Sequence, residues 1–212
     1  MISEQNYEHV KKSIQIHAKL VGKSYLVLYK TSRNQTASVM EINVEEQGFW
    51  HLIGCRIDST LNLNSKEKHD LYISCLKGND VSESLDYTRQ PQDVKKKAYA
   101  FISVFDFISD AKSVVLCPTE GTEEINMYKI GIGANTGIIG YDTAKGYYYP
   151  KTTQDKSIFG IGNTANNRIF LILSKNCNEK KYTNIEYSIS KKIFPDILEE
   201  IPGNISYDIG EI

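Results

Sequence analysis

A change in hydrophobic periodicity partway along the chain constrains its fold most. From residue 92 to 109, apolar residues recur every three or four positions, which predicts a long amphipathic helix in the core. After residue 113 the pattern becomes strand-like and is interrupted by Gly, Asn, Asp and Pro, as in an antiparallel meander; the expected strands are 113–117, 125–132, 136–141, 146–149, 168–174 and 182–188. Helices early and strands late predict an α+β fold, with N-terminal helices packed on a C-terminal antiparallel β-sheet.

The first half of the chain adds local signals to this pattern. Residues 3–21 carry an apolar stripe at helical spacing, and residues 24–31 and 36–44 have strand composition with a turn between them. Asn64 and Glu67 have the spacing of a capping box, which predicts a short helix that ends near Gly78. A helix, a hairpin and a second helix therefore precede the long helix.

The length and composition favour one globular unit. With 212 residues and 41% hydrophobic content, the chain can bury one good-sized core. We expect a single α+β domain over residues 1–190 and a C-terminal extension over 191–212. No internal repeat or low-complexity linker argues for a second domain.

The charge balance gives no global sign of a polyanion partner. Lys and Arg number 25 and Asp and Glu 26, so the net charge is -1, and a site for nucleic acid must be local. The N-terminus lacks a signal-peptide pattern and no apolar run approaches the roughly 18 residues of a membrane span. Four widely spaced cysteines fit reduced thiols. We expect a cytoplasmic protein with no membrane partner.

The hexapeptide Phe49–Gly54 contains the only tryptophan, Trp50, next to His51. Packing and solvent would together set the pKa and tautomer of this imidazole, which is suited to proton transfer near neutral pH. The alternative is a half-buried core histidine with no chemical role, and the hexapeptide taken alone favours that alternative.

A zinc site is a further alternative. His51, Cys55, His69 and Cys75 have roughly finger-like separations, but apolar residues lie within the first pair and no Cys-x-x-Cys knuckle is present. We therefore expect no metal and no cofactor.

Residues 145–153 combine lysines, stackable tyrosine rings and threonine hydroxyls at the exit from a predicted strand. Such groups can hold a phosphate and a flanking base. A tyrosine-rich strand edge protected by lysines explains the same composition, so this segment alone leaves both interpretations open.

The hexapeptide around His51, the long helix and the run Tyr148-Tyr149-Pro150-Lys151-Thr152 resemble, in that order and at similar spacing, a phage-associated group of small nuclease-like domains. This is the fourth phage group of the fold shared by barnase, EndoU, colicin-type tRNases and RelE-like toxins (the BECR fold). The resemblance spans roughly residues 5–190. It implies a metal-independent endoribonuclease in which a ribose 2′-hydroxyl attacks the adjacent phosphate.

The resemblance also assigns residues. The histidine of the family motif corresponds to His51, which would act as general base or acid, and the hydroxyl after the proline corresponds to Thr152, a donor to the phosphate. Tyr149 would stack on a base or transfer a proton, and Lys145 or Lys151 would hold the phosphate.

Tyr148 completes the expected substrate-binding motif, with Lys30 and Arg56 as weaker candidates. The implied substrate is RNA, with tRNA among the candidates, and the implied partner is an antitoxin or immunity protein. No second catalytic histidine is evident, so a competing hypothesis is a catalytically inactive RNA- or protein-binding module of a phage or mobile element.

Overall fold

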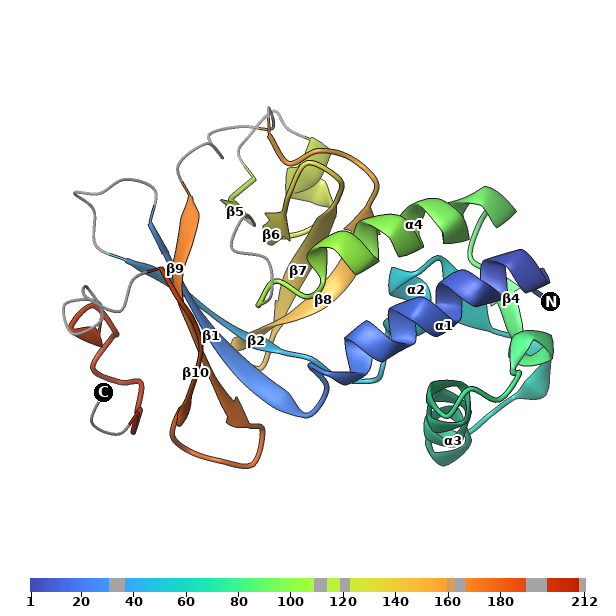
Figure 1. The fold of residues 1–212 in the computed structure, drawn as a ribbon, viewed down its shortest axis with the longest axis horizontal. Coiled ribbons are helices and arrows are strands. Elements are labelled where there is room, and N and C mark those ends of the chain that lie inside the picture. Colours follow the sequence, from blue (N-terminus) through green and yellow to red (C-terminus); the bar gives the residue numbers. More distant parts are fainter. Residues whose placement is uncertain are drawn as a thin grey trace.

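A computed structural model describes residues 1–30, 37–108, 114–118, 123–159, 161, 167–189 and 198–209 (Figure 1). Within these ranges the α-helices are α1 (Glu4–Ala18), α2 (Phe49–Leu52), α3 (Ser65–Leu76) and α4 (Pro91–Val104), with 3-10 turns at η1 (Ser59–Leu61), η2 (Ser82–Ser84) and η3 (Glu123–Asn126). The strands are β1 (Lys23–Lys30), β2 (Ser38–Asn43), β3 (Cys55–Ile57), β4 (Leu85–Tyr87), β5 (Val114–Leu116), β6 (Ile130–Gly133), β7 (Ile138–Ala144), β8 (Tyr147–Gln154), β9 (Arg168–Asn176) and β10 (Asn184–Ser188). The predicted α+β class is confirmed.

Helix starts follow the local sequence. The Asn64 side chain accepts a hydrogen bond from the backbone N–H of Glu67, and the Glu67 carboxylate accepts one from the backbone N–H of Asn64, so the predicted capping box is present. Pro91 begins α4, where a missing N–H costs nothing. The long helix ends at Val104, before the predicted end at 109; residue 109 lies outside the described residues.

The sheet differs from the expected C-terminal meander. Its eight strands run in the order β1-β2-β8-β7-β6-β5-β9-β10, and β1 also pairs with β9, so the sheet curls back on itself. It therefore includes the N-terminal hairpin strands, and β2 pairs with β8 in parallel through Ile42 and Tyr148. Strand β1 is buried along almost its whole length, because β2 and β9 pair with its two edges and apolar clusters cover both of its faces.

Two further expectations change in the structure. The strand predicted at 125–132 begins only at Ile130, because Glu123–Asn126 forms a 3-10 turn, and the strand predicted at 146–149 extends to Gln154. The predicted turn at 32–35, together with residues 36, 113 and 190–197, lies outside the described residues.

Helices and sheet share the main hydrophobic core, which includes Ile14 of α1, Phe101 of α4 and Val27 of β1. Helix α4 runs close to β7: a Cβ atom added at Gly137 would come within 2.6 Å of the Ala100 Cβ. Figure 1 shows α4 beside this part of the sheet, with α1 alongside α4. This packing fixes α4 beside the strands that carry the candidate site.

A smaller apolar cluster covers the other face of β1 and β9. It contains Leu28, Leu171, Tyr182 and Ile201, so the C-terminal segment contributes to the packing of the sheet. Among the described residues, no helix is both long and apolar enough to cross a lipid bilayer.

Candidate functional site

Helix α2 presents His51 to solvent and its other residues to the core. Phe49, Trp50 and Leu52 are buried, whereas His51 is exposed. Gly48 and Gly54 flank the helix with φ of 91° and 82°, a backbone conformation that glycine adopts without strain. The core-residue alternative for His51 is therefore wrong: packing holds the helix and leaves the imidazole accessible.

His51 lines a pocket of about 470 Å³ formed by helices and strands that are distant in sequence. The lining residues are His51, Arg56, Thr88, Arg89, Lys97, Met127, Thr152 and Thr153. We call this the basic pocket. It brings together three residues proposed from the sequence, namely His51, Arg56 and Thr152. The approach of strand β8 to helix α2, which the sequence left open, is thus observed.

Gly54 fixes the geometry of this pocket. Its carbonyl oxygen accepts hydrogen bonds from the backbone N–H of Thr88 at 3.0 Å and from Thr88 Oγ1 at 2.9 Å. A Cβ atom at position 54 would lie only 3.3 Å from the Val94 nitrogen. The end of α2 therefore packs closely against the first turn of α4, which brings Arg89 and Lys97 toward His51.

The cations of the basic pocket act on the imidazole. Partial desolvation of the ring in the pocket, followed by the positive charges of Lys97 and Arg89, holds the pKa of His51 below its usual value. Burial and the charge of Arg89 also lower the pKa of Lys97. In the described part of the chain, neither Arg89 nor Lys97 has a carboxylate ion-pair partner. His51 is therefore neutral at physiological pH, in a pocket suited to an anion.

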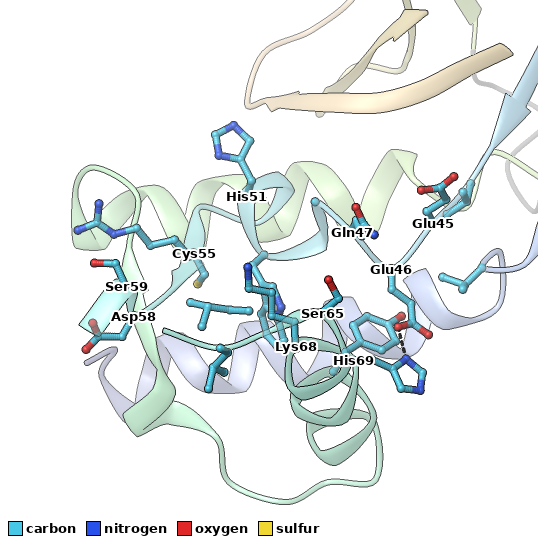
Figure 2. Close-up of a pocket in the computed structure, with 18 of the residues that line it drawn as sticks. Glu45, Glu46, Gln47, His51, Cys55, Asp58, Ser59, Ser65, Lys68 and His69 are labelled. Carbon is cyan, nitrogen blue, oxygen red and sulfur yellow. Dashed lines mark hydrogen bonds and ion pairs between the residues drawn. The ribbon is translucent and has the colours of Figure 1, made fainter. Parts of the chain in front are cut away.

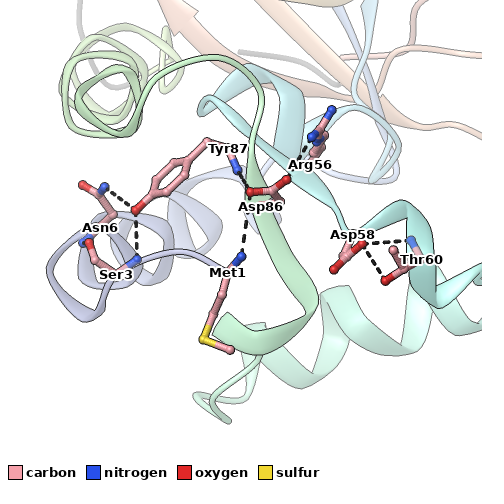
Figure 3. Close-up of polar contacts among 8 residues, drawn as sticks. All are labelled: Met1, Ser3, Asn6, Arg56, Asp58, Thr60, Asp86 and Tyr87. Carbon is pink, nitrogen blue, oxygen red and sulfur yellow. Dashed lines mark hydrogen bonds and ion pairs between the residues drawn. The ribbon is translucent and has the colours of Figure 1, made fainter.

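Arg56 is positioned differently from the other two cations. Its Nη2 atom lies 2.9 Å from Asp86 Oδ2 across the β3–β4 pair (Figure 3). Hydrogen bonds from Arg56 and from the Tyr87 backbone lower the pKa of the Asp86 carboxyl. Because the Asp86 carboxylate already partly neutralises the Arg56 guanidinium, Arg56 is the weakest anion ligand of the three cations.

Thr153, which lines the pocket, has a hydroxyl with no hydrogen-bond partner among the described residues. Thr153 is 2% exposed. Buried hydroxyls nearly always have a partner, which here can be water or a bound ligand. The neighbouring Thr152 is partly exposed and lines the same pocket.

A second, larger pocket of about 1040 Å³ lies on the other side of His51 and shares His51 and Arg56 with the basic pocket. Its lining includes Glu46 and His69, whose Oε2 and Nδ1 atoms are 2.6 Å apart. Figure 2 shows this pair, with the His51 ring projecting from α2 away from it. His51 thus lies between a basic and a mixed-charge pocket.

Two of the proposed lysines make other contacts. Lys30 is ion-paired with Glu200, and its Nζ atom lies 5.5 Å from the centre of the Phe170 ring. Lys151 Nζ lies 2.9 Å from Asp142 Oδ2 on the neighbouring strand. Neither lysine lines the basic pocket.

The remaining three proposed residues also lie outside the basic pocket. Lys145 is in the turn between β7 and β8, with φ of 53°. Tyr148 pairs with Ile42 of β2 and packs against the main core, and Tyr149 pairs with Asp142 of β7. Because β8 pairs with β7 on one side and, at Tyr148, with β2 on the other, this segment is not a free strand edge, and the strand-edge interpretation is wrong.

Sequence reasoning missed two cations of the pocket. Lys97 belongs to the run Lys95-Lys96-Lys97 and lies three residues after buried Val94, so it borders the apolar face of α4. This spacing indicates a lysine whose alkyl chain packs against neighbouring helices or strands. Arg89 lies in a short connection before α4, where the sequence gives no comparable signal.

The zinc alternative has no support in the structure. Cys55 and Cys75 are buried, whereas His69 is exposed and paired with Glu46. Over the described ranges, no three His, Cys, Asp or Glu side chains gather as ligands for a metal ion.

A family model described as phage-Barnase-EndoU-ColicinE5/D-RelE like nuclease 4 matches residues 9–191, a range that contains every residue of the basic pocket. No curated protein and no solved structure matches the chain.

Proposed function

The chain belongs to the family of phage-Barnase-EndoU-ColicinE5/D-RelE like nucleases, group 4, and we propose from this that it is an endoribonuclease whose active site is the basic pocket. The observation that carries the proposal is the placement of His51, Thr152, Arg89 and Lys97 around one pocket. The pocket combines a neutral base, a hydroxyl donor and cations, the groups required for attack of a ribose 2′-hydroxyl on phosphate.

In the proposed reaction, neutral His51 takes the proton of the 2′-hydroxyl as its oxygen attacks phosphorus. The bond from phosphorus to the 5′-oxygen breaks, which leaves a 2′,3′-cyclic phosphate and a free 5′-hydroxyl. Arg89, Arg56 and the Thr152 hydroxyl stabilise charge on the non-bridging oxygens. No metal ion is required, because these groups supply the charge stabilisation.

We assign Lys97 as the acid that protonates the departing 5′-oxygen. Burial and Arg89 lower its pKa, which makes its ammonium a better proton donor than an exposed lysine. Lys97→Arg tests this role: the charge is kept but the guanidinium does not release a proton. We expect substrate affinity to persist while kcat falls about 100-fold or more. An unchanged kcat would remove Lys97 from this role.

The function is tested by incubating the protein with tRNA and with RNA oligonucleotides in the presence of EDTA. We expect cleavage that yields a 2′,3′-cyclic phosphate and that falls by about 10²- to 10⁴-fold in His51→Ala. His69→Ala is the matched control, since His69 is an exposed histidine that does not line the basic pocket. Cleavage that survives His51→Ala, or that EDTA abolishes, contradicts the proposal. Binding without cleavage would support the inactive binding module instead.

A further inference from the structure

Helices α1 and α4 carry a group of cationic and aromatic side chains outside the basic pocket: the exposed Lys12, Lys95, Lys96 and Tyr99, and the partly buried His9. We call this group the α1/α4 patch. The two helices lie side by side (Figure 1). The His9 and Tyr99 ring centres are 5.2 Å apart, and Tyr99 is 56% exposed. An exposed tyrosine held by a neighbouring ring offers a flat surface for stacking.

The lysines of the patch form a local excess of positive charge. Burial, and then the charges of Lys12 and Lys95, lower the pKa of His9, so ammonium groups from both helices act on the same imidazole. Glu8 is already ion-paired with Lys11. Among the residues that the structure describes, Lys12, Lys95 and Lys96 have no carboxylate ion-pair partner. Their charges are therefore available to an external anion.

Helix geometry connects this patch to the basic pocket. Successive helical residues are rotated by about 100° and rise about 1.5 Å, so Lys95, Lys96 and Lys97 form a band about 200° around α4 and only about 3 Å along it. Lys97, at one end of the band, lines the basic pocket. Lys95, at the other end, lies one turn before Tyr99. A chain with regularly spaced anions can follow this band from the pocket across the helix.

We propose that the α1/α4 patch binds a single-stranded extension of the RNA whose scissile phosphate occupies the basic pocket. Lys12, Lys95 and Lys96 contact its phosphates, and Tyr99 stacks on one of its bases. Cationic side chains beside an exposed aromatic ring are the usual means of holding single strands without sequence preference. This inference rests on the proposed function, and it predicts that affinity depends on substrate length.

Binding of uncleavable oligonucleotides tests the inference. Fluorescence anisotropy would compare a 2′-O-methyl dinucleotide, which fills only the pocket, with a 2′-O-methyl 12-mer. For Lys12→Gln/Lys95→Gln we expect the 12-mer Kd to rise about tenfold, and the slope of log K against log salt to fall in magnitude by about 1.4, with no change for the dinucleotide. Tyr99→Ala should weaken 12-mer binding about tenfold with no change in that slope.

The control is Lys66→Gln/Lys77→Gln, which removes the same charge from exposed positions of α3 and its C-cap. Equal weakening by the two double variants, or wild-type 12-mer binding by Lys12→Gln/Lys95→Gln, would overturn the inference. Cleavage of an unmodified dinucleotide tests the pocket separately. If the protein cleaves nothing but still needs Lys12 and Lys95 to bind the 12-mer, the proposed function fails and the patch remains an RNA-binding surface.

Discussion

On its two sides, helix α2 has histidines in opposite environments: His17 of α1, packed against the core side, and its own His51. Phe49 faces the core, where its ring centre lies 4.9 Å from that of His17. His17 is 0% exposed. His51, two residues later, is exposed and faces Arg89 and Lys97 in the basic pocket. The lesson is that an imidazole near aromatic residues becomes a packing group or a candidate catalyst according to which helix face carries it.

The buried histidine is held as a neutral ring. Its Nδ1 atom lies 2.8 Å from the Tyr72 hydroxyl, and the Phe105 ring stacks on it at 5.2 Å. Burial lowers the pKa of His17 to about 3. Both histidines are therefore neutral at pH 7, but only His51 can reach a substrate.

The largest expected difference between the two sides is in stability. Phe49→Ala removes a fully buried ring and should lower the free energy of unfolding by about 3–5 kcal/mol. His51→Ala should change it by less than about 0.5 kcal/mol, because the side chain is exposed. Urea denaturation of the two variants measures both values. Similar losses in the two would show that His51 has a structural role.

The next effect is the pH dependence of stability caused by His17. Between its ordinary pKa of 6.5 and its folded value of about 3, the unfolded state binds a proton that the folded state does not. Stability therefore falls as the pH falls through this range, by about 2.7 kcal/mol at pH 4.5. His17→Asn cannot titrate and keeps a polar atom near Tyr72, so its loss of stability between pH 7 and pH 4.5 should be smaller by that amount.

Thermal or urea unfolding at the two pH values makes this comparison. His69→Asn, at an exposed site, is the control and should keep the wild-type difference. If His17→Asn also keeps the wild-type difference in stability between pH 7 and pH 4.5, groups other than His17 cause the acid sensitivity.

A smaller effect distinguishes the two arginines of the basic pocket. Arg89→Met should reduce kcat/KM about 10- to 100-fold, since a hydrogen bond to a charged group contributes about 1.5–3 kcal/mol. Arg56→Met should reduce it less, because Asp86 already holds the Arg56 guanidinium. Steady-state cleavage of a dinucleotide gives both values, and the reverse order would contradict this electrostatic assignment.

The smallest effect is on the pH profile of Arg89→Met. The Arg89 charge helps to hold the pKa of His51 down, so its removal raises that pKa. Since His51 acts as a base, activity rises with pH as the ring loses its proton, and the acid limb of kcat/KM should move to higher pH. Arg56 is not among the charges that lower this pKa, so Arg56→Met should leave the limb in place. A shift to lower pH in Arg89→Met would be inconsistent with His51 as the base.

Local signals in the sequence predicted part of this molecule. The capping box at Asn64 and the apolar face of α4 involve residues three or four apart, and both are present. The closing of the sheet involves pairs such as Tyr25 with Ser174, which no local pattern encodes. Strand and helix periodicity therefore predicted the class of the fold but not the arrangement of the strands.

The sequence likewise predicted only part of the candidate site. The hexapeptide singled out His51, but its neighbours suggested a core residue, because sequence alone does not show which face of a four-residue helix is buried. Lys145 and Lys151 were proposed from their proximity to the tyrosines, whereas the pocket contains Lys97 of α4 and Arg89 of the connection that precedes α4. Cations that converge through tertiary packing are not visible in sequence spacing.

The most direct test of the central claim, that the basic pocket at His51 binds the RNA phosphate, is an NMR titration of the four histidines with and without a nucleoside 3′-monophosphate. We predict that the ligand shifts the His51 ring resonances and raises the His51 pKa, because a phosphate anion favours the protonated imidazole. The resonances of His17 and His69 should not change. Binding of the nucleotide with no change in the His51 resonance or pKa would contradict the account.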